Sequence, residues 1–146
     1  MFEDNYMSDL IMLVDDDDSL RKVTEYNLVS AGFRVISVST GSEALEIFSK
    51  KTADLVITDV QLGDMNGLDV LAEIKKNAPD IPVIVITAFG SIDMAVNAMN
   101  LGAFTFITKP FDRDTLRRSC EKALEFLSLR VQTKALSEEV NKLTGT

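Results

Sequence analysis

Short apolar runs alternate along the chain with longer segments whose apolar residues fall at helical spacing. Runs rich in Val and Ile and bounded by polar residues predict buried strands, and apolar residues three or four positions apart predict amphipathic helices. The expected strands cover residues 10–14, 34–39, 55–58, 83–87 and 104–107. The expected helices cover residues 19–30, a segment capped by Thr40 or Ser42, residues 68–76, residues 91–101, and a last segment from about residue 112.

This alternation of strands and helices indicates an α/β domain. Strands separated by helices pair in parallel and place helices on both faces of one sheet. The run 83–87 is apolar on both of its faces, as a central parallel strand should be. In the first helix, Leu20, Val23 and Leu28 have the spacing of a core-facing stripe. Folds of this kind bind ligands at the carboxyl ends of their strands, so we expect the functional residues there.

Polar residues follow four of the expected strands at their carboxyl ends. Because parallel strands end at one edge of the sheet, side chains from distant parts of the chain should converge there. The set is Asp15 and Asp16 after the first strand, Asp59 after the third, Thr87 at the end of the fourth, and Lys109 after the fifth.

These residue types form a coherent set for phosphoryl transfer. Two acids can hold Mg²⁺, and Asp59, on the middle strand, is placed to be a nucleophile that accepts a phosphoryl group. The Thr87 hydroxyl and the Lys109 ammonium can bind phosphoryl oxygens. Taken singly, Thr87 could equally be an ordinary strand-end hydroxyl, and Lys109 an exposed lysine before a proline.

Four consecutive acids, Asp15 to Asp18, stand directly after the first apolar run. Asp is a poor strand residue, so the strand should stop there. Clustered carboxylates repel one another unless a positive charge lies among them. One interpretation is a site for a hard cation such as Mg²⁺, and the other is a solvated turn that caps the next helix. For Asp17 and Asp18 we favour the second, with Ser19, as negative charge at a helix N-terminus.

Composition fits one domain and excludes several functions. The chain has 146 residues, of which 46% are apolar. It contains no membrane-length apolar run and no basic, then apolar, signal pattern. The single Cys120 cannot form an internal disulfide, which fits a cytoplasmic protein. The net charge of −8 argues against direct nucleic-acid binding. The absence of His excludes His-based catalysis and His-ligated zinc.

From about residue 10 to about residue 127, the sequence resembles the receiver domains of bacterial two-component response regulators. Four motifs carry the resemblance. Each motif is weak by itself, but the four together, in this order and at the spacing of the family, are specific. They are Val14-Asp15-Asp16, Ile57-Thr58-Asp59, Val85-Ile86-Thr87-Ala88 and Thr108-Lys109-Pro110-Phe111. The resemblance implies a flavodoxin-like (CheY-like), doubly wound (βα)5 fold with a parallel sheet in the order 2-1-3-4-5.

The resemblance also implies a role for each matched residue. Asp59 would accept a phosphoryl group from a sensor histidine kinase. Thr87 and Lys109 would bind that group, and an aromatic at Phe106 would swing inward as part of a switch that includes Thr87. The Lys109-Pro110 bond would be cis. The Mg²⁺ ligands would be Asp15, Asp16, Asp59 and the main-chain carbonyl of Gln61.

Two further positions tune the phosphoryl lifetime in this family, and here they are Gln61 and Phe89. A bulky apolar Phe89 offers nothing to orient an attacking water, which predicts comparatively slow autodephosphorylation. The switch role of Phe106 rests on resemblance alone, since a strand Phe is more often a core residue. The chain would catalyse only its own phosphorylation and dephosphorylation.

The chain continues past the receiver as an expected helix. We divide it into an N-terminal tail (1–8), the receiver (9–127) and a helical extension (128–146). Apolar residues in the extension follow a heptad pattern, which predicts a homodimer, or else packing on a downstream domain. Thr133 interrupts the pattern in a core position. The seam residues are Phe126, Leu129, Leu136, Val140 and Leu143.

The segment 91–96, together with the helical extension, is most similar to NtrC-type, sigma-54-dependent activators. Such regulators carry an AAA+ ATPase and a DNA-binding domain after the receiver, and neither is present in this sequence. We therefore expect it to be a piece of a longer transcriptional regulator whose output is controlled by phosphorylation.

Other classes of protein remain as alternatives. A haloacid-dehalogenase-like phosphatase would use Asp15 and Asp17 as nucleophile and partner acid, but it would leave Asp59 unexplained. A flavodoxin-like binding module would need a Ser/Thr/Gly-rich phosphate loop, and four acids would repel a flavin phosphate. A receiver that works as a phosphorylation-independent interaction module would not need the intact acceptor set.

Overall fold

The computed structural model describes the backbone of residues 9–88 and 91–144, and their side chains apart from those of residues 134, 135 and 137–144. Within these ranges, strands and helices alternate as the sequence predicts. The strands are β1 (Leu10–Val14), β2 (Arg34–Val38), β3 (Leu55–Asp59), β4 (Val83–Thr87) and β5 (Thr105–Thr108). The helices are α2 (Asp18–Ser30), α3 (Gly41–Lys50), α4 (Gly67–Asn77), α5 (Ile92–Asn100) and α6 (Arg113–Thr144).

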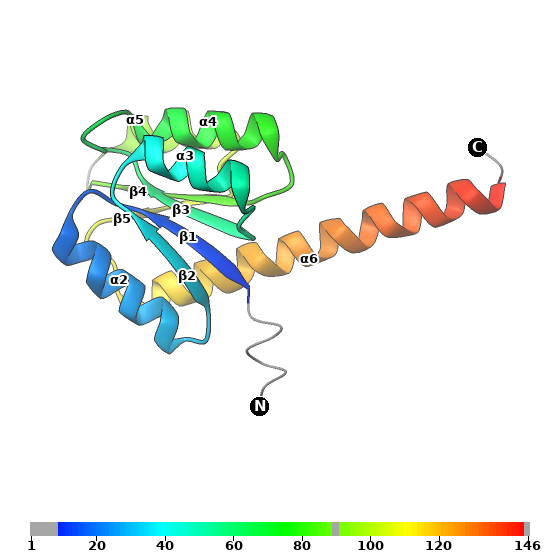
Figure 1. Cartoon of the computed structure of the whole chain (residues 1–146), viewed down its shortest axis with the longest axis horizontal. Coiled ribbons are helices and arrows are strands. Elements are labelled where there is room, and N and C mark those ends of the chain that lie inside the picture. Colours follow the sequence, from blue (N-terminus) through cyan, green and yellow to red (C-terminus); the bar gives the residue numbers. More distant parts are fainter. Residues whose placement is uncertain (1–8, 89–90, 145–146) are drawn as a thin grey trace.

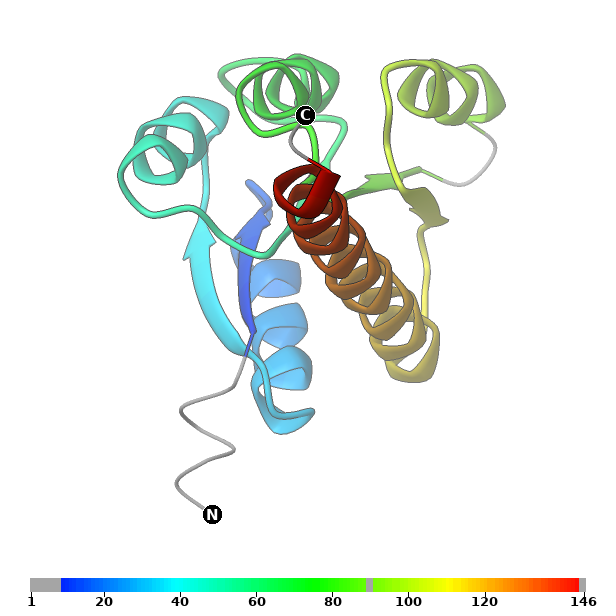
Figure 2. The ribbon, with the colours of Figure 1, turned by 90° about the vertical axis from the view of Figure 1, so that its right-hand side faces the viewer.

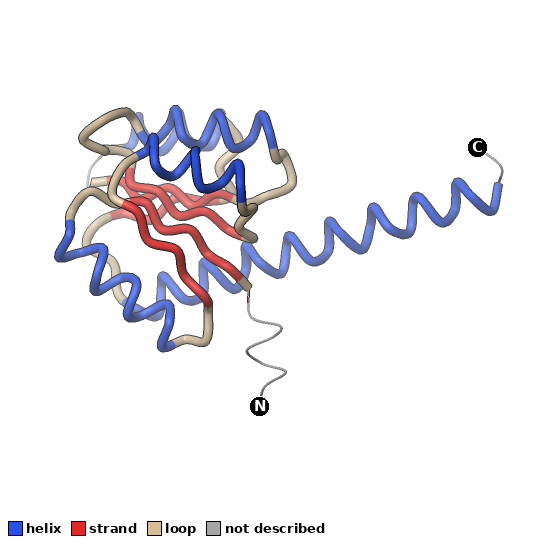
Figure 3. Tube along the Cα trace, viewed as in Figure 1, coloured by secondary structure: helices blue, strands red, loops and turns tan. Residues whose placement is uncertain are grey.

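The five strands form one parallel sheet in the order β2-β1-β3-β4-β5, which confirms the predicted topology (Figures 1 and 3). The strands pair in register, with Val14 opposite both Val38 and Thr58, and Asp59 opposite Ile86. This register brings the carboxyl ends of β1, β3 and β4 to neighbouring positions along one edge. Residues that follow these strands must therefore lie close together, whatever their separation in sequence.

Helices cover both faces of the sheet, as Figure 2 shows in a view toward the end of α6. On one face, α3, α4 and α5 pack on side chains such as Met12, Val56 and Val85. On the other face, α2 and α6 pack on Ile11, Ile57 and their neighbours. Alternate residues of each strand thus enter opposite cores, and both cores are apolar. The nearly continuous Val/Ile runs of the strands follow from this double burial.

Several element ends and faces differ from the predictions. Strand β2 ends at Val38, one residue early, and β5 runs from Thr105 to Thr108, one residue late. Helix α5 ends at Asn100, and Ser91 stands at its N-cap without a side-chain capping bond. The prediction that Val23 is a core residue was wrong. The Val23 side chain is 56% exposed, and the neighbouring Thr24 is buried. Residues 24 and 28 are four apart and share one helix face, whereas Val23 points about 100° away.

Short polar side chains cap three of the other helices, and a glycine follows each of α2 and α5. Asp17, Thr40 and Asn66 stand at the N-caps of α2, α3 and α4, where each side chain accepts a hydrogen bond from a backbone N–H of the first turn. Gly32 and Gly102 follow α2 and α5 with φ of 102° and 99°, a conformation that glycine adopts without steric cost. The predicted capping role of the acids after β1 is therefore correct for Asp17.

Helix α6 is much longer than the domain requires. Its first turns are buried through Leu116 and Cys120, so the Cys120 thiol packs as an apolar residue. Its 32 residues span roughly 48 Å at 1.5 Å per residue, and the second half projects away from the sheet (Figure 1). No helix in the described part of the chain is long and apolar enough to cross a membrane.

The start of the predicted seam contacts the body of the same chain. The rings of Phe126 and Phe104 lie 5.4 Å apart between centroids. The Arg130 guanidinium lies 5.8 Å from the Phe126 ring centroid and pairs with Asp80 at 3.1 Å. Farther along, Leu129 and Leu136 are exposed. The side chains of Val140 and Leu143 lie outside the described residues.

Candidate functional site

The residues predicted from the strand ends meet at one edge of the sheet. A pocket of about 240 Å³ opens there, between the loops that follow β1, β3 and β4. Its wall also includes Ser91, at the N-cap of α5, and Met94 of that helix, neither of which the sequence predicted as a pocket residue. Asp15 is buried directly behind this edge. Besides Ser91, the polar residues that line the pocket are Asp16, Asp17, Asp59, Gln61, Thr87 and Lys109.

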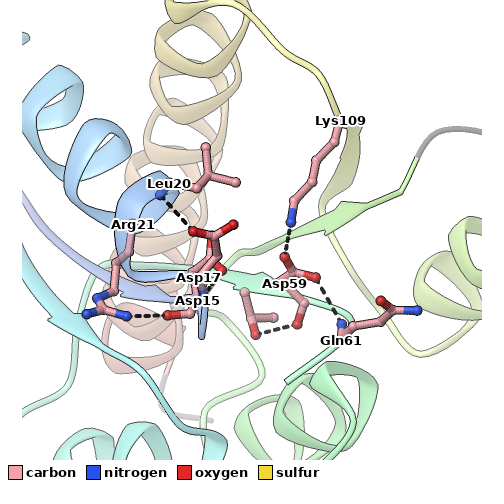
Figure 4. Close-up of polar contacts among 8 residues, drawn as sticks. Asp15, Asp17, Leu20, Arg21, Asp59, Gln61 and Lys109 are labelled. Carbon is pink, nitrogen blue, oxygen red and sulfur yellow. Dashed lines mark hydrogen bonds and ion pairs between the residues drawn. The ribbon is translucent and has the colours of Figure 1, made fainter. Parts of the chain in front are cut away.

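Asp59 is the most constrained carboxylate of the site, and both of its oxygens have partners (Figure 4). Oδ2 forms an ion pair with the Nζ of Lys109. Oδ1 accepts a hydrogen bond of 2.9 Å from the backbone N–H of Gln61. The Thr58 hydroxyl donates to the main-chain carbonyl of Asp59 at 3.0 Å. The last residue of β3 is thus held rigidly with its carboxylate at the pocket.

The pKa values of Asp15 and Lys109 are both raised, which disfavours the charged form of Asp15 and favours the charged form of Lys109. Burial raises the pKa of Asp15; a hydrogen bond from the Asp17 N–H opposes the rise, and the negative charge of Asp59 adds to it. Burial alone would lower the pKa of Lys109, but its hydrogen bond and attraction to Asp59 outweigh burial and raise that pKa. Lys109 therefore keeps its positive charge at neutral pH, in the middle of the acids.

An arginine that was not among the predicted residues binds the turn after β1. Arg21 donates from Nη1 to the carbonyl oxygen of Asp15 at 2.7 Å and pairs with Asp18 at 2.7 Å. Asp17 Oδ1 accepts from the Leu20 N–H at 3.0 Å (Figure 4). Asp17 thus has two roles, as helix cap and as a wall of the pocket. The cue in the sequence was a basic residue one helical turn after the acids.

Thr87 is buried at the end of β4, and its Oγ1 has no hydrogen-bond partner among the described residues. A buried hydroxyl without a partner is unfavourable and calls for an explanation. Thr87 also lines the pocket, so an oxygen atom of a bound group could supply the missing partner. This observation argues against an ordinary strand-end hydroxyl.

The donors at the site are the hard oxygens that Mg²⁺ prefers. Within the described ranges, no three acidic or cysteine side chains are gathered closely enough to form a metal site by themselves. A cation bound here would need a main-chain carbonyl and water to complete its shell, which suits Mg²⁺ because it usually retains several waters. The oxygen donors therefore fit a Mg²⁺ ion that keeps part of its water shell.

Phe106 is not a core residue, although a strand Phe usually is. Its side chain is 41% exposed. It lines an apolar groove of about 250 Å³ together with Ile92, Val96 and Met99 of α5. The groove borders the pocket, since Ser91 lines both. Lys109-Pro110 is cis, as expected. Phe89, the second lifetime position, lies outside the described residues.

The sequence of this chain matches the model of the response regulator receiver domain over residues 11–121. The chain belongs to this family. It is 43% identical over 115 residues to the transcriptional regulatory protein GlrR of Escherichia coli K12, which covers 79% of this chain and 26% of that protein. It is 40% identical over 126 residues to the C4-dicarboxylate transport transcriptional regulatory protein DctD of Rhizobium meliloti, which covers 86% and 27%.

Solved structures show the same fold. NtrX from Brucella abortus superposes with a TM-score of 0.84 at 34% identity, over 89% of this chain and 30% of NtrX. The receiver domain of a LuxO-type repressor from Vibrio parahaemolyticus superposes with a TM-score of 0.81 at 32% identity, over 87% and 98%. This chain therefore covers nearly all of that solved receiver domain and about a quarter of the length of the regulators GlrR and DctD.

Proposed function

We propose that this chain is the phosphorylation-activated switch of an NtrC-type transcriptional regulator, that Asp59 is its acceptor, and that it acts in the cytoplasm. The observation that carries the proposal is the placement of Asp59, buried at the end of the central strand with Lys109 paired to one carboxylate oxygen. A phosphatase that used Asp15 as nucleophile would need that residue to line the pocket, whereas Asp59 lines the pocket and Asp15 is not among its lining residues.

In the proposed reaction, a carboxylate oxygen of Asp59 attacks the phosphorus of a phosphohistidine on a sensor kinase. The new O–P bond forms as the P–N bond breaks, and its electron pair returns to the imidazole nitrogen. The Lys109 ammonium neutralises charge on the transferred oxygens, and the Thr87 hydroxyl donates to one of them. Most of the work is positioning and electrostatic stabilisation.

Mg²⁺ would neutralise charge between the carboxylates and the phosphoryl oxygens. The proposed ligands are the side chains of Asp15, Asp16 and Asp59 and the main-chain carbonyl of Gln61. Asp16 is exposed at the pocket, and Asp15 interacts electrostatically with Asp59, which supports a shared cation. The raised pKa of Asp15 indicates that its charged form is disfavoured until a cation compensates it.

The response to phosphorylation would run from Thr87 to Phe106. The unpartnered Thr87 hydroxyl would turn to the phosphoryl group and leave space behind it. Phe106, exposed in the adjoining groove, would move inward into that space. Gln61 and Phe89 would set the lifetime of the acyl phosphate, and the apolar Phe89 predicts slow hydrolysis.

The remaining proposals concern partners. Residues 9–127 would form the receiver, preceded by a tail (1–8), and residues 128–146 would lead toward an output unit, which in the parent protein could comprise an AAA+ ATPase and a DNA-binding domain. Two copies would pair along the α6 seam. The exposed Leu129 and Leu136 support this pairing, whereas Phe126 is partly covered by Phe104.

The direct test of the switch chemistry uses a small phosphodonor in place of the kinase. Incubation with acetyl phosphate and Mg²⁺ should add a single phosphoryl group to the intact chain, as measured by mass spectrometry. Removal of Mg²⁺ with EDTA should suppress the adduct at least tenfold, because the carboxylates then repel the incoming oxygens. An adduct that forms equally well in EDTA would contradict the metal-dependent reaction.

A further inference from the structure

The loop between β3 and α4 carries a carboxylate that bonds to a different helix. Asp64 lies five residues after Asp59 in this loop. Its Oδ1 accepts a hydrogen bond of 2.9 Å from the backbone N–H of Gly41. Its Oδ2 accepts from both the N–H and the hydroxyl of Ser42, each at 2.9 Å. Three hydrogen bonds thus tie the tip of the loop to the first turn of α3.

Close packing between Gly41 and Met65 supports the same contact between the loop and α3. Gly41 is buried against Met65, the neighbour of Asp64. A Cβ at position 41 would overlap the Met65 side chain and lie 3.0 Å from Cγ2 of Val70. A glycine at this position lets α3 approach the loop closely. Asp64 and Met65 together therefore hold the loop against α3.

This attachment does not depend on pH in the physiological range. The hydrogen bonds from Gly41 and then Ser42 lower the pKa of the Asp64 carboxyl to about 2, so it stays ionised near neutral pH. A negative charge is also favourable at a helix N-terminus, where the first N–H groups lack partners in the helix. The carboxylate is therefore a permanent anchor for the loop.

The loop has further restraints besides Asp64: the Gln61 N–H donates to Asp59 Oδ1, and the side chains of Leu62 and Met65 pack on the core. Gln61 and Asn66 form an isolated bridge across its base, and the Gly67 N–H donates to the Val60 carbonyl at 2.7 Å. Between them, Gly63 is exposed and makes no close packing contact; the atom nearest to a Cβ added there would be Oδ2 of Asp16, at 3.7 Å. Glycine broadens the conformations open to a loop, so the anchor at Asp64 limits the freedom of the segment between Gln61 and Asn66.

We propose that Asp64 is a positioning residue, which holds the acceptor loop so that the carbonyl of Gln61 and the carboxylate of Asp16 are ready to bind Mg²⁺. The inference rests on the proposed function, because it assumes that the cation binds at this pocket. Asp64 itself lies outside the pocket and touches neither the cation nor the phosphoryl group. Without the anchor, the loop must be ordered at the moment of binding, and Mg²⁺ affinity falls.

Asp64→Asn tests this role, because it removes the charge and one of the two acceptor oxygens. Asp69→Asn is the matched control: it removes the same charge from an exposed acid in the first turn of α4. Mg²⁺ affinity is measured by NMR titration of backbone amides, and hydrogen exchange of the Gly41 and Ser42 amides reports whether the anchor has opened. The phosphorylation rate with acetyl phosphate is recorded at several Mg²⁺ concentrations.

We expect Asp64→Asn to speed exchange at both amides and to weaken Mg²⁺ binding about three- to tenfold, with a rate restored by high Mg²⁺. Asp69→Asn should change affinity less than twofold. Should Asp64→Asn not fold, Asp64→Glu replaces it, with the same expected direction. Equal Mg²⁺ affinity in the Asp64 variant and the control, despite faster exchange, would reduce Asp64 to a helix cap and overturn the inference alone. A wild-type chain that neither binds Mg²⁺ nor forms an adduct would overturn the proposed function as well.

Discussion

Gly67→Ala should destabilise the domain by about 3 kcal/mol or more, the largest effect we expect from adding a single methyl group. A Cβ at position 67 would overlap the carbonyl oxygen of Asp59 and lie 2.8 Å and 2.9 Å from the Asp59 carbonyl carbon and the Val60 Cα. All three atoms belong to the backbone at the end of the central strand, so no side-chain rotation can relieve the overlap. The start of α4 must shift, or Asp59 must.

Urea unfolding followed by circular dichroism measures this effect, and Gly63→Ala provides the control. Gly63 lies four residues earlier, in the loop that leads to α4, and its added Cβ would meet only Asp16 Oδ2, at an ordinary 3.7 Å. Its free energy of unfolding should change by less than about 1 kcal/mol. Equal stability of the two variants would mean that the packing of α4 against Asp59 is looser than described.

Lys109→Met should slow phosphorylation by acetyl phosphate about 100-fold or more, the usual size of the loss when one preorganised donor is removed. Met retains much of the apolar stem but has no ammonium group to neutralise the phosphoryl oxygens. The ion pair with Asp59 also disappears, which leaves that carboxylate beside the negative charge of Asp15. Mg²⁺ should still bind, because Lys109 is not among the proposed ligands.

Initial rates of adduct formation, measured at saturating Mg²⁺, give the size of this effect. Lys76→Met removes an exposed lysine in the last turn of α4 and changes the net charge equally, so its rate should stay within about twofold of the wild type. A Lys109→Met rate as high as that of the control would show that the ammonium does not act on the phosphoryl group.

The sequence predicts that the side chains of the candidate site lie together because the topology of a parallel sheet brings the strand ends to one edge. Asp15, Asp59, Thr87 and Lys109 each follow a distinct apolar run, and any parallel sheet with this alternation must gather the ends of those runs at one edge. The order of the strands came from the resemblance to a family, because periodicity alone does not tell which strands are neighbours. The apolar runs also predict both cores, since each strand is covered on two faces.

The sequence did not predict the burial of Thr24, the exposure of Phe106 or the contacts of Asp64. These features depend on how distant segments pack, which no local sequence pattern encodes. Val23 is exposed and Thr24 is buried because Thr24 lies four residues before the buried Leu28, on the same face of α2. Phe106 lies on the edge strand β5 and lines the groove beside α5, where it stays partly exposed. The role of Asp64 could not be seen because its partners lie more than twenty residues earlier in the chain.

The heptad pattern of the helical extension does not predict the contacts that the start of the extension makes in the structure. The heptad pattern predicts a seam from Phe126 onward, yet Phe126 and Arg130 contact Phe104 and Asp80 of the receiver itself. The first turn of the seam therefore also fixes the direction in which α6 leaves the domain. Leu129 and Leu136 remain exposed and available to a second helix.

The most direct test of the central claim is to locate the phosphoryl group on the chain. After reaction with acetyl phosphate and Mg²⁺, the acyl phosphate is reduced with borohydride and its position is read by peptide mass spectrometry, with Asp59→Asn treated in parallel. We predict modification at Asp59 alone and no adduct in the variant. Modification at Asp15 that persists in Asp59→Asn would contradict the account and favour a phosphatase-like chemistry, in which the first strand carries the nucleophile.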